Sequence, residues 1–190
     1  VPPPEFLDWD FWLGPAPWRP YSAFGLAEGP HWSWRWIRDF SGGQLTDWAG
    51  HHIDIAHWGM GMELSGPASI EGRADFMIGD AWTVHDTYHV EMMYPNGVQV
   101  ILDNSFPNGI RFEGTEGWVF CARGTAQVTS SDPGAAAQKD GRKSLDASDS
   151  KLLTAPLGAD AKRWMASDDS YRNWLEAIAR RQDPIAPVDQ

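Results

Sequence analysis

The chain has 190 residues and a formal net charge of −11, so its surface repels nucleic-acid phosphates and offers no basic stretch for anionic lipid. No apolar run approaches the roughly 20 residues that a membrane-spanning helix needs, which disfavours a membrane partner. A single cysteine, Cys121, excludes an intrachain disulfide, whereas the twelve tryptophans fit either a rigid core or a surface that stacks on sugar rings.

The two ends of the sequence carry no obvious terminal element. The chain begins at Val1, runs directly into three prolines and stops at Gln190 soon after the last predicted helix. We expect both ends to be cuts in a longer chain. A signal peptide would lie upstream of Val1, so the compartment, cytoplasmic or periplasmic, stays undecided.

Residues 1–43 form an aromatic and proline-rich opening segment. A short helix is predicted over residues 6–13, closed by Gly14 and Pro15, and the prolines that follow impose an extended path. Aromatic and polar residues alternate from His31 to Trp36, which predicts a strand or a surface loop.

A helix is predicted over residues 44–60, after the turn at Gly42-Gly43. Its apolar residues lie nearly all round, so the pattern predicts a buried helix.

The middle of the chain, residues 68–123, is predicted to be a β-sheet. Short turns separate the predicted strands, which favours antiparallel pairing. The strand over residues 84–94 alternates, with His85, Thr87, His89 and Glu91 predicted on one face and Val84, Tyr88, Val90, Met92 and Tyr94 on the other, Asp86 being an exception.

The last third of the chain is predicted to be a loop and a helix. Residues 130–150 are rich in Ser, Asp, Ala and Gly and predict a flexible loop. Residues 168–182 predict a late helix capped by the Asp168-Asp169-Ser170 sequence. The pattern as a whole indicates an α+β domain.

Asp47 and His51 are the sharpest candidates for catalysis. At a spacing of i, i+4 on a helix, the two side chains share one face, with Cβ atoms about 5–6 Å apart. A carboxylate beside an imidazole orients it as a general base that removes a hydroxyl proton. Asp54, one turn further on, extends the same stripe. The same spacing also fits a purely structural His–Asp pair in a buried helix.

The sequence also bears on two other kinds of site, a metal site and a dinucleotide site. The residue types that could bind a metal occur at Asp47, His51, His52, His57, His85 and His89. Their spacing matches no established metal-binding motif. A dinucleotide site needs a glycine-rich turn between a strand and a helix, and the sequence contains no G-x-G-x-x-G motif in such a place. The sequence therefore predicts no metal and no Rossmann domain within these residues.

The segment Gly42–Asp54, GGQLTDWAGHHID, resembles the G-G-x-L-x-D-x-x-x-H-x-x-D signature of the Gfo/Idh/MocA oxidoreductases. Three further stretches resemble a bacterial subgroup of that family, namely Leu7–Ala16, Arg111–Trp118 and the late helix with residues 184–187. The resemblance runs from about Glu5 to Pro187, with the loop over residues 130–150 unmatched.

The resemblance implies a two-domain enzyme that acts with NAD or NADP on a secondary hydroxyl of a sugar or polyol. In that case this chain is the C-terminal substrate-binding and oligomerisation domain, built on an open, mostly antiparallel sheet with helices packed on one face. The cofactor is implied to bind mainly to an N-terminal Rossmann domain absent from this chain. The family's catalytic lysine has no match here, so this chain alone is expected to be inactive.

The resemblance also assigns roles to residues. Asp47 and His51 correspond to the catalytic Asp and His, and the segment before the glycine pair implies substrate contacts from His31, Trp34, Arg35 and Trp36. For Arg35 and Trp36, pairing with a local acid and burial in the core are equally open. The open sheet face is implied to form a homo-oligomer, through His85, His89, Glu91, Gln99, Arg111 and Glu113.

Two alternative functions stay open from the sequence. The first is a stand-alone sugar-binding or assembly module without catalysis. The second is a metal-dependent sugar hydrolase or lyase that uses the histidines. The identity of the sugar and the choice between NAD and NADP are not predicted.

Overall fold

The computed structural model describes residues 2–21, 29–76, 82–122, 144–156, 158–162, 165 and 167–188. The chain divides into two compact units, each of which is described by itself. The first contains residues 1–60 and 67–107, and the second contains residues 61–66 and 108–190.

The first unit begins with a small aromatic core. Helix α1, Trp9–Leu13, is capped by the Asp8 side chain, which accepts a hydrogen bond from the backbone N–H of Phe11. Trp9 stacks on Trp12 with ring centroids 4.9 Å apart. The buried members of the core are Trp9, Leu13 and Ile37, with Leu7, Trp12, Tyr21, Trp34 and Phe40 packed around them. Several of the tryptophans are therefore core residues, which agrees with one of the two interpretations of the composition.

Residues 30–36 are helical, so the predicted strand or loop there is wrong. Pro30 begins helix α2, Pro30–Ser33, and a 3₁₀ turn, η2, Trp34–Trp36, follows it directly. The fixed φ of a proline at the first position suits a helix start, and Gly29 supplies the positive φ just before it. Alternating residue types over six positions did not distinguish this arrangement from a strand.

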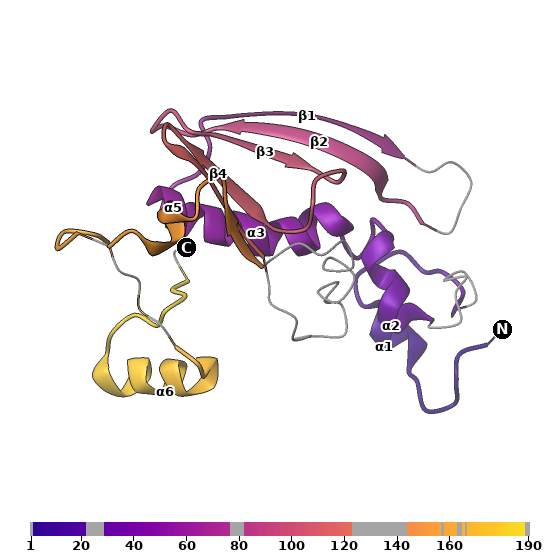
Figure 1. The fold of residues 1–190 in the computed structure, drawn as a ribbon. Helices are drawn as coiled ribbons and strands as arrows, with labels where there is room; N and C mark the ends of the chain where they lie inside the picture. Colours follow the sequence, from indigo (N-terminus) through magenta and orange to yellow (C-terminus); the bar gives the residue numbers. More distant parts are fainter. Residues whose placement is uncertain are drawn as a thin grey trace. The chain divides into compact units, whose positions relative to one another are not determined.

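Helix α3, Gln44–Met60, matches the predicted helix at both ends. Within its unit it buries one side only, through Trp48, Ala49 and Ala56, and is not buried all round as predicted. Figure 1 shows α3 running along one side of the sheet β1–β2–β3. His57 and Tyr94 join the two layers through a hydrogen bond of 2.7 Å.

The sheet of the first unit is antiparallel, in the order β1, Ser69–Phe76, then β2, His85–Met93, then β3, Gln99–Asp103. Tyr88 and Met92 of β2 are buried, as the alternation predicted. A β-bulge shifts the pairing between Asp75↔Thr87 and Phe76↔His85 and leaves Asp86 without a partner in β1. The bulge explains why Asp86 breaks the alternation.

The second unit has its own antiparallel sheet. Its strands are β4, Ile110–Gly114, β5, Gly117–Cys121, and β6, Leu145–Ala147, in the order β4-β5-β6. The short helix α5, Lys151–Thr154, packs against β5 and β6. The predicted sheet over residues 68–123 is thus two sheets, and the α+β class with antiparallel strands is confirmed.

The predicted loop over residues 130–150 is wrong at Leu145–Ala147. Residues 130–143 lie outside the described residues. Leu145–Ala147 is a strand and not a loop, because its backbone pairs with β5 and the Ser148 hydroxyl accepts from the N–H of Trp118. A polar composition did not reveal these long-range partners.

Helix α6, Ser170–Arg180, confirms the predicted late helix and its cap, because the Asp169 side chain accepts from the backbone N–H of Arg172. Its apolar stripe is exposed within its unit, and consists of Tyr171, Trp174, Leu175 and Ile178. Across the described residues, none of the helices combines the length and apolarity required to cross a membrane.

Candidate functional site

The Gly42-Gly43 turn determines how α3 begins. Gly43 has φ +66°, and a Cβ there would lie 2.9 Å from Cγ2 of Val84. A Cβ on Gly42 would lie 2.5 Å from the Thr46 methyl group. The Thr46 hydroxyl accepts from the N–H of Gly42 at 3.0 Å and donates to the Gly43 carbonyl at 3.3 Å. The glycine pair and Thr46 therefore form one local structure, which determines where α3 begins and the direction of its first turns.

Asp47 and His51 follow on successive turns of α3, as predicted. Oδ2 of Asp47 accepts a hydrogen bond from Nε of Arg35 at 3.2 Å. His51 is exposed, and its ring lies edge-on to Trp48 with centroids 5.7 Å apart. Both residues lie in the described part of the chain, and no hydrogen bond joins them there. The polar partner of Asp47 is thus Arg35 and not the histidine one turn away.

Arg35 reaches Asp47 from the turn η2. Its guanidinium carbon lies 5.1 Å from the ring centroid of Trp32 and 4.7 Å from that of Trp34. The side chains of Arg35 and Asp47 are 18% and 26% exposed, so the ion pair is partly shielded from water. A cation over an indole face is attracted by the ring quadrupole, so the two tryptophans add to the restraint on the guanidinium.

The backbone of η2 is fixed by the segment that precedes β2. The N–H groups of Thr83 and Val84 donate to the Trp36 carbonyl, at 2.9 and 3.3 Å. The N–H of Arg38 donates to the Thr83 hydroxyl at 2.8 Å, and Ile37 is fully buried. These contacts determine where Arg35 leaves the backbone.

The other predicted substrate residues lie differently. Trp34 is half-buried, packs against the aromatic core and lies beside Arg35. Trp36 is half-buried, and its ring centroid lies 5.9 Å from that of Trp82. His31 is exposed on α2. The structure therefore places Arg35 against Asp47 and Trp34 beside Arg35. Among the described residues, no hydrogen bond or ion pair joins His31 or Trp36 to Asp47.

His85 lies near this site, which the sequence did not predict. Its Cε1 is 3.5 Å from the position that a Cβ of Gly43 would take, and its ring lies edge-on to Tyr88. Its Nε2 is buried and has no hydrogen-bond partner in the described structure, and burial lowers the pKa of the imidazole. The prediction that His85 shares a face with His89 is wrong, because the bulge at Asp86 turns His85 to the side of Tyr88.

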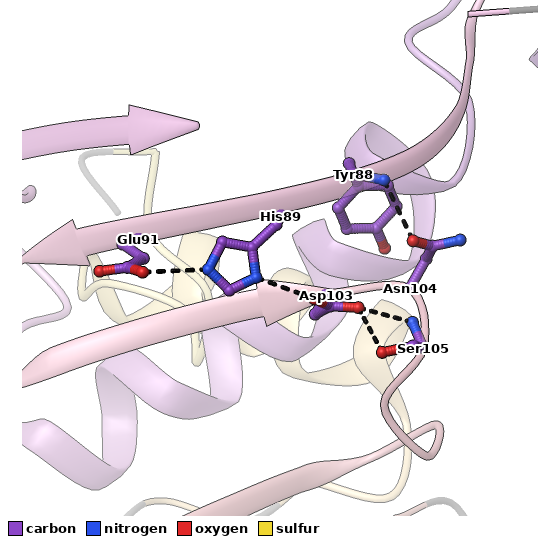
Figure 2. Close-up of polar contacts among 6 residues, drawn as sticks. All are labelled: Tyr88, His89, Glu91, Asp103, Asn104 and Ser105. Atoms are coloured by element: carbon purple, nitrogen blue, oxygen red, sulfur yellow. Dashed lines mark hydrogen bonds and ion pairs between the residues drawn. The ribbon is translucent and has the colours of Figure 1, made fainter. Parts of the chain in front are cut away.

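A second polar cluster lies on the other face of the same sheet (Figure 2). Nδ1 of His89 is 2.8 Å from Asp103, and Nε2 is 3.0 Å from Glu91. The hydrogen bonds to Glu91 and Asp103 raise the pKa of His89. Asp103 also accepts from the hydroxyl and N–H of Ser105, and these bonds with that from His89 lower its pKa to about 2. Glu91 in turn accepts from Gln99 at 2.8 Å.

Arg111 and Glu113 were predicted to share that face, which is wrong. They lie on β4 of the second sheet, where Nε of Arg111 donates to Glu113 at 2.7 Å. The guanidinium of Arg111 lies 5.4 Å from the ring centroid of Trp118. A sequence pattern locates a strand but does not say which sheet it joins.

In the described part of the chain, the candidate metal ligands from the sequence do not form a cluster that would hold a metal. Across the described ranges, no group of three or more His, Cys, Asp or Glu side chains is placed to hold a metal ion.

Comparison with known proteins identifies the family. The model of the C-terminal alpha/beta domain of an oxidoreductase family, Gfo/Idh/MocA, matches residues 1–130. The chain belongs to the Gfo/Idh/MocA oxidoreductase family. The match covers the aromatic segment, α3 and the five strands β1 to β5 of this Gfo/Idh/MocA domain. A search of curated proteins found no match.

Proposed function

We propose that this Gfo/Idh/MocA domain binds a sugar or polyol beside the first two turns of α3 and handles the proton of the hydroxyl that is oxidised. One observation carries the proposal, namely that Arg35 holds the Asp47 carboxylate while the His51 imidazole, one turn away on the same helix, is exposed. The family match supports an oxidoreductase context for this geometry.

The two residues have separate roles in this proposal. Oδ2 of Asp47 is bonded to Arg35, which leaves Oδ1 as the acceptor for one substrate hydroxyl. His51 takes the proton from the neighbouring hydroxyl as a general base, because a neutral imidazole has a ring nitrogen that accepts. We assign only proton handling and substrate orientation to this domain.

Indole rings near the ion pair suit a carbohydrate ligand. Trp32 and Trp34 both lie within 5.1 Å of the Arg35 guanidinium. Sugars present apolar C–H faces as well as hydroxyls, so rigid aromatic surfaces beside hydrogen-bonding groups suit them. The class of ligand in the proposal is therefore a neutral sugar or polyol.

NAD or NADP, which the family implies, does not fit the residues described here. A dinucleotide site needs a strand, a glycine-rich turn and a helix within a parallel sheet. Both sheets are antiparallel, and the glycine turn before α3 follows the 3₁₀ turn η2 and not a strand. We propose that NAD(P) binds to another domain of the protein, with this domain contributing only the substrate side.

We further propose that the face of the sheet β1–β2–β3 that carries His89 forms the subunit interface of a homo-oligomer. Met93 and Ile101 on this face are each 41% exposed, beside the hydrogen-bonded cluster around His89. Partly exposed apolar side chains bordered by hydrogen-bonding groups fit the apolar core and polar rim of a subunit interface. Sedimentation equilibrium with the Ile101→Asp variant tests it: a shift to monomer supports the interface, and an unchanged mass contradicts it.

Calorimetry on the 190-residue chain tests the proposed function. We expect D-glucose or sorbitol to bind at about millimolar concentration, and NADH to bind no more tightly than AMP. Tight NADH binding by this chain would overturn the proposal that NAD(P) binds to another domain. Absence of sugar binding at about 100 mM would overturn the substrate site itself.

A further inference from the structure

We infer that Arg35 is the positioning residue for Asp47, and that it determines which of two partners the Asp47 carboxylate takes. This inference deepens the proposed function and rests on it for its consequence in substrate binding. The contact itself does not depend on the proposed function: Nε of Arg35 lies 3.2 Å from Oδ2 of Asp47, and two indole rings flank the guanidinium.

The Asp47 side chain has two possible partners on its own side of α3. His51 is at i+4, a spacing at which Asp and His side chains readily meet on a helix. Arg35 lies twelve residues earlier in the chain and is nevertheless the partner that the carboxylate takes. A cation whose position the fold already determines is favoured over the local partner, because less side-chain entropy is lost when the pair forms.

The fold determines the position of Arg35 independently of Asp47. The carbonyl of Trp36 accepts two backbone hydrogen bonds from residues 83 and 84, and the adjacent Ile37 is fully buried. Trp34 packs against the aromatic core and presents its ring to the guanidinium. Because little side-chain freedom is left to lose, the Arg35–Asp47 hydrogen bond forms at a small entropic cost.

The consequence concerns both candidate catalytic side chains. While Arg35 holds Oδ2, Asp47 cannot turn toward His51, so the imidazole stays accessible to substrate and the carboxylate keeps one fixed orientation. Without Arg35, the carboxylate is expected to pair with His51 and close the site. Arg35 therefore acts through Asp47 and has no proton-transfer role of its own.

Side-chain NMR of the 190-residue chain tests the pairing without any ligand. We expect the Arg35 Nε–H resonance to be resolved in the wild type and to shift in Asp47→Asn, since the charge-assisted bond is lost. In Arg35→Gln, the His51 ring signals are expected to move, and the move is expected to vanish in the Arg35→Gln/Asp47→Asn double variant. An Arg35 Nε–H signal indifferent to Asp47→Asn would overturn the inference, and this readout does not depend on Arg35→Gln folding.

Binding of D-glucose or sorbitol tests the consequence. Arg35→Gln is expected to weaken affinity about tenfold, and Arg35→Lys, which keeps the charge without the planar donor, about threefold. In the Asp47→Asn background, Arg35→Gln is expected to change affinity less than about twofold, because both variants remove the same interaction. Multiplicative losses would contradict action through Asp47.

Arg38→Gln is the matched control. It removes the same charge from an exposed position three residues along the chain and is expected to leave both the NMR signals and the affinity unchanged. If the wild type binds neither sugar, the proposed function fails, whereas the ligand-free NMR cycle still decides whether Arg35 positions Asp47. The two failures are thus distinguishable.

Discussion

Replacing Gly43 with alanine is expected to destabilise the domain, because the position excludes a side chain for two separate reasons. Its φ is +66°, where an L-residue costs about 1–2 kcal/mol. The new Cβ would also lie 2.9 Å from Cγ2 and 3.3 Å from Cβ of Val84, which is only 3% exposed and cannot retreat. Overpacking of this kind costs about 1–3 kcal/mol, so we expect a loss of ~2–5 kcal/mol in all.

Urea denaturation followed by tryptophan fluorescence measures this loss. The matched control is Gly50→Ala on the exposed side of α3, where a Cβ meets nothing within 4 Å. Alanine is the better helix former, so this variant is expected to gain about 0.5–1 kcal/mol. A Gly43→Ala variant within about 0.5 kcal/mol of the wild type would refute the claim that the glycine turn and Val84 together fix the start of α3.

Two further outcomes follow from the first unit. Because the pKa of His89 is raised, its contribution to stability is fully present below pH 6.5 and is lost as pH rises through the raised value. The unfolding free energy, measured from pH 5 to 9, should therefore fall with rising pH in the wild type and much less in His89→Gln. An identical slope in both proteins would contradict the bridge from His89 to Glu91. Tyr94 is only 2% exposed, and Tyr94→Phe removes its 2.7 Å hydrogen bond to His57, so the variant should lose about 1–2 kcal/mol of stability. Tyr171 is 83% exposed, so Tyr171→Phe should lose less than about 0.5 kcal/mol. Equal effects of the two tyrosine variants would show that the His57 bond does not tie α3 to the sheet.

Features that depend on local sequence were predictable. The boundaries of α3 follow from a glycine pair at one end and Gly61 at the other, and the cap of α6 follows from Asp169. The alternation in β2 correctly predicted that Tyr88 and Met92 are buried. In each case the determining contact lies within a few residues of the pattern.

Features that depend on distant partners were not predictable in the same way. The bulge at Asp86 depends on how β1 pairs with β2, so the alternation alone misplaced His85. Likewise, nothing local assigns β4 to a separate sheet.

The candidate site shows the same division. The Asp47–His51 spacing is visible in the sequence because both residues lie on one helix. The choice of Arg35 as the partner of Asp47 depends on the helical turn at residues 34–36 and on its anchoring by Thr83 and Val84, which the sequence did not predict. Arg35 was nevertheless among the candidate residues, because of the segment's resemblance to the family.

The central claim is that Asp47 and His51 serve a ligand and not the fold, and one paired measurement tests it most directly. Sugar affinity and unfolding free energy are measured together for the wild type, Asp47→Asn and His51→Gln. We expect each variant to weaken binding of D-glucose or sorbitol about tenfold or more, while His51→Gln, at an exposed position, changes stability by less than about 0.5 kcal/mol. Unchanged binding in both variants, or a loss of stability in His51→Gln that accounts for the loss of binding, would contradict it.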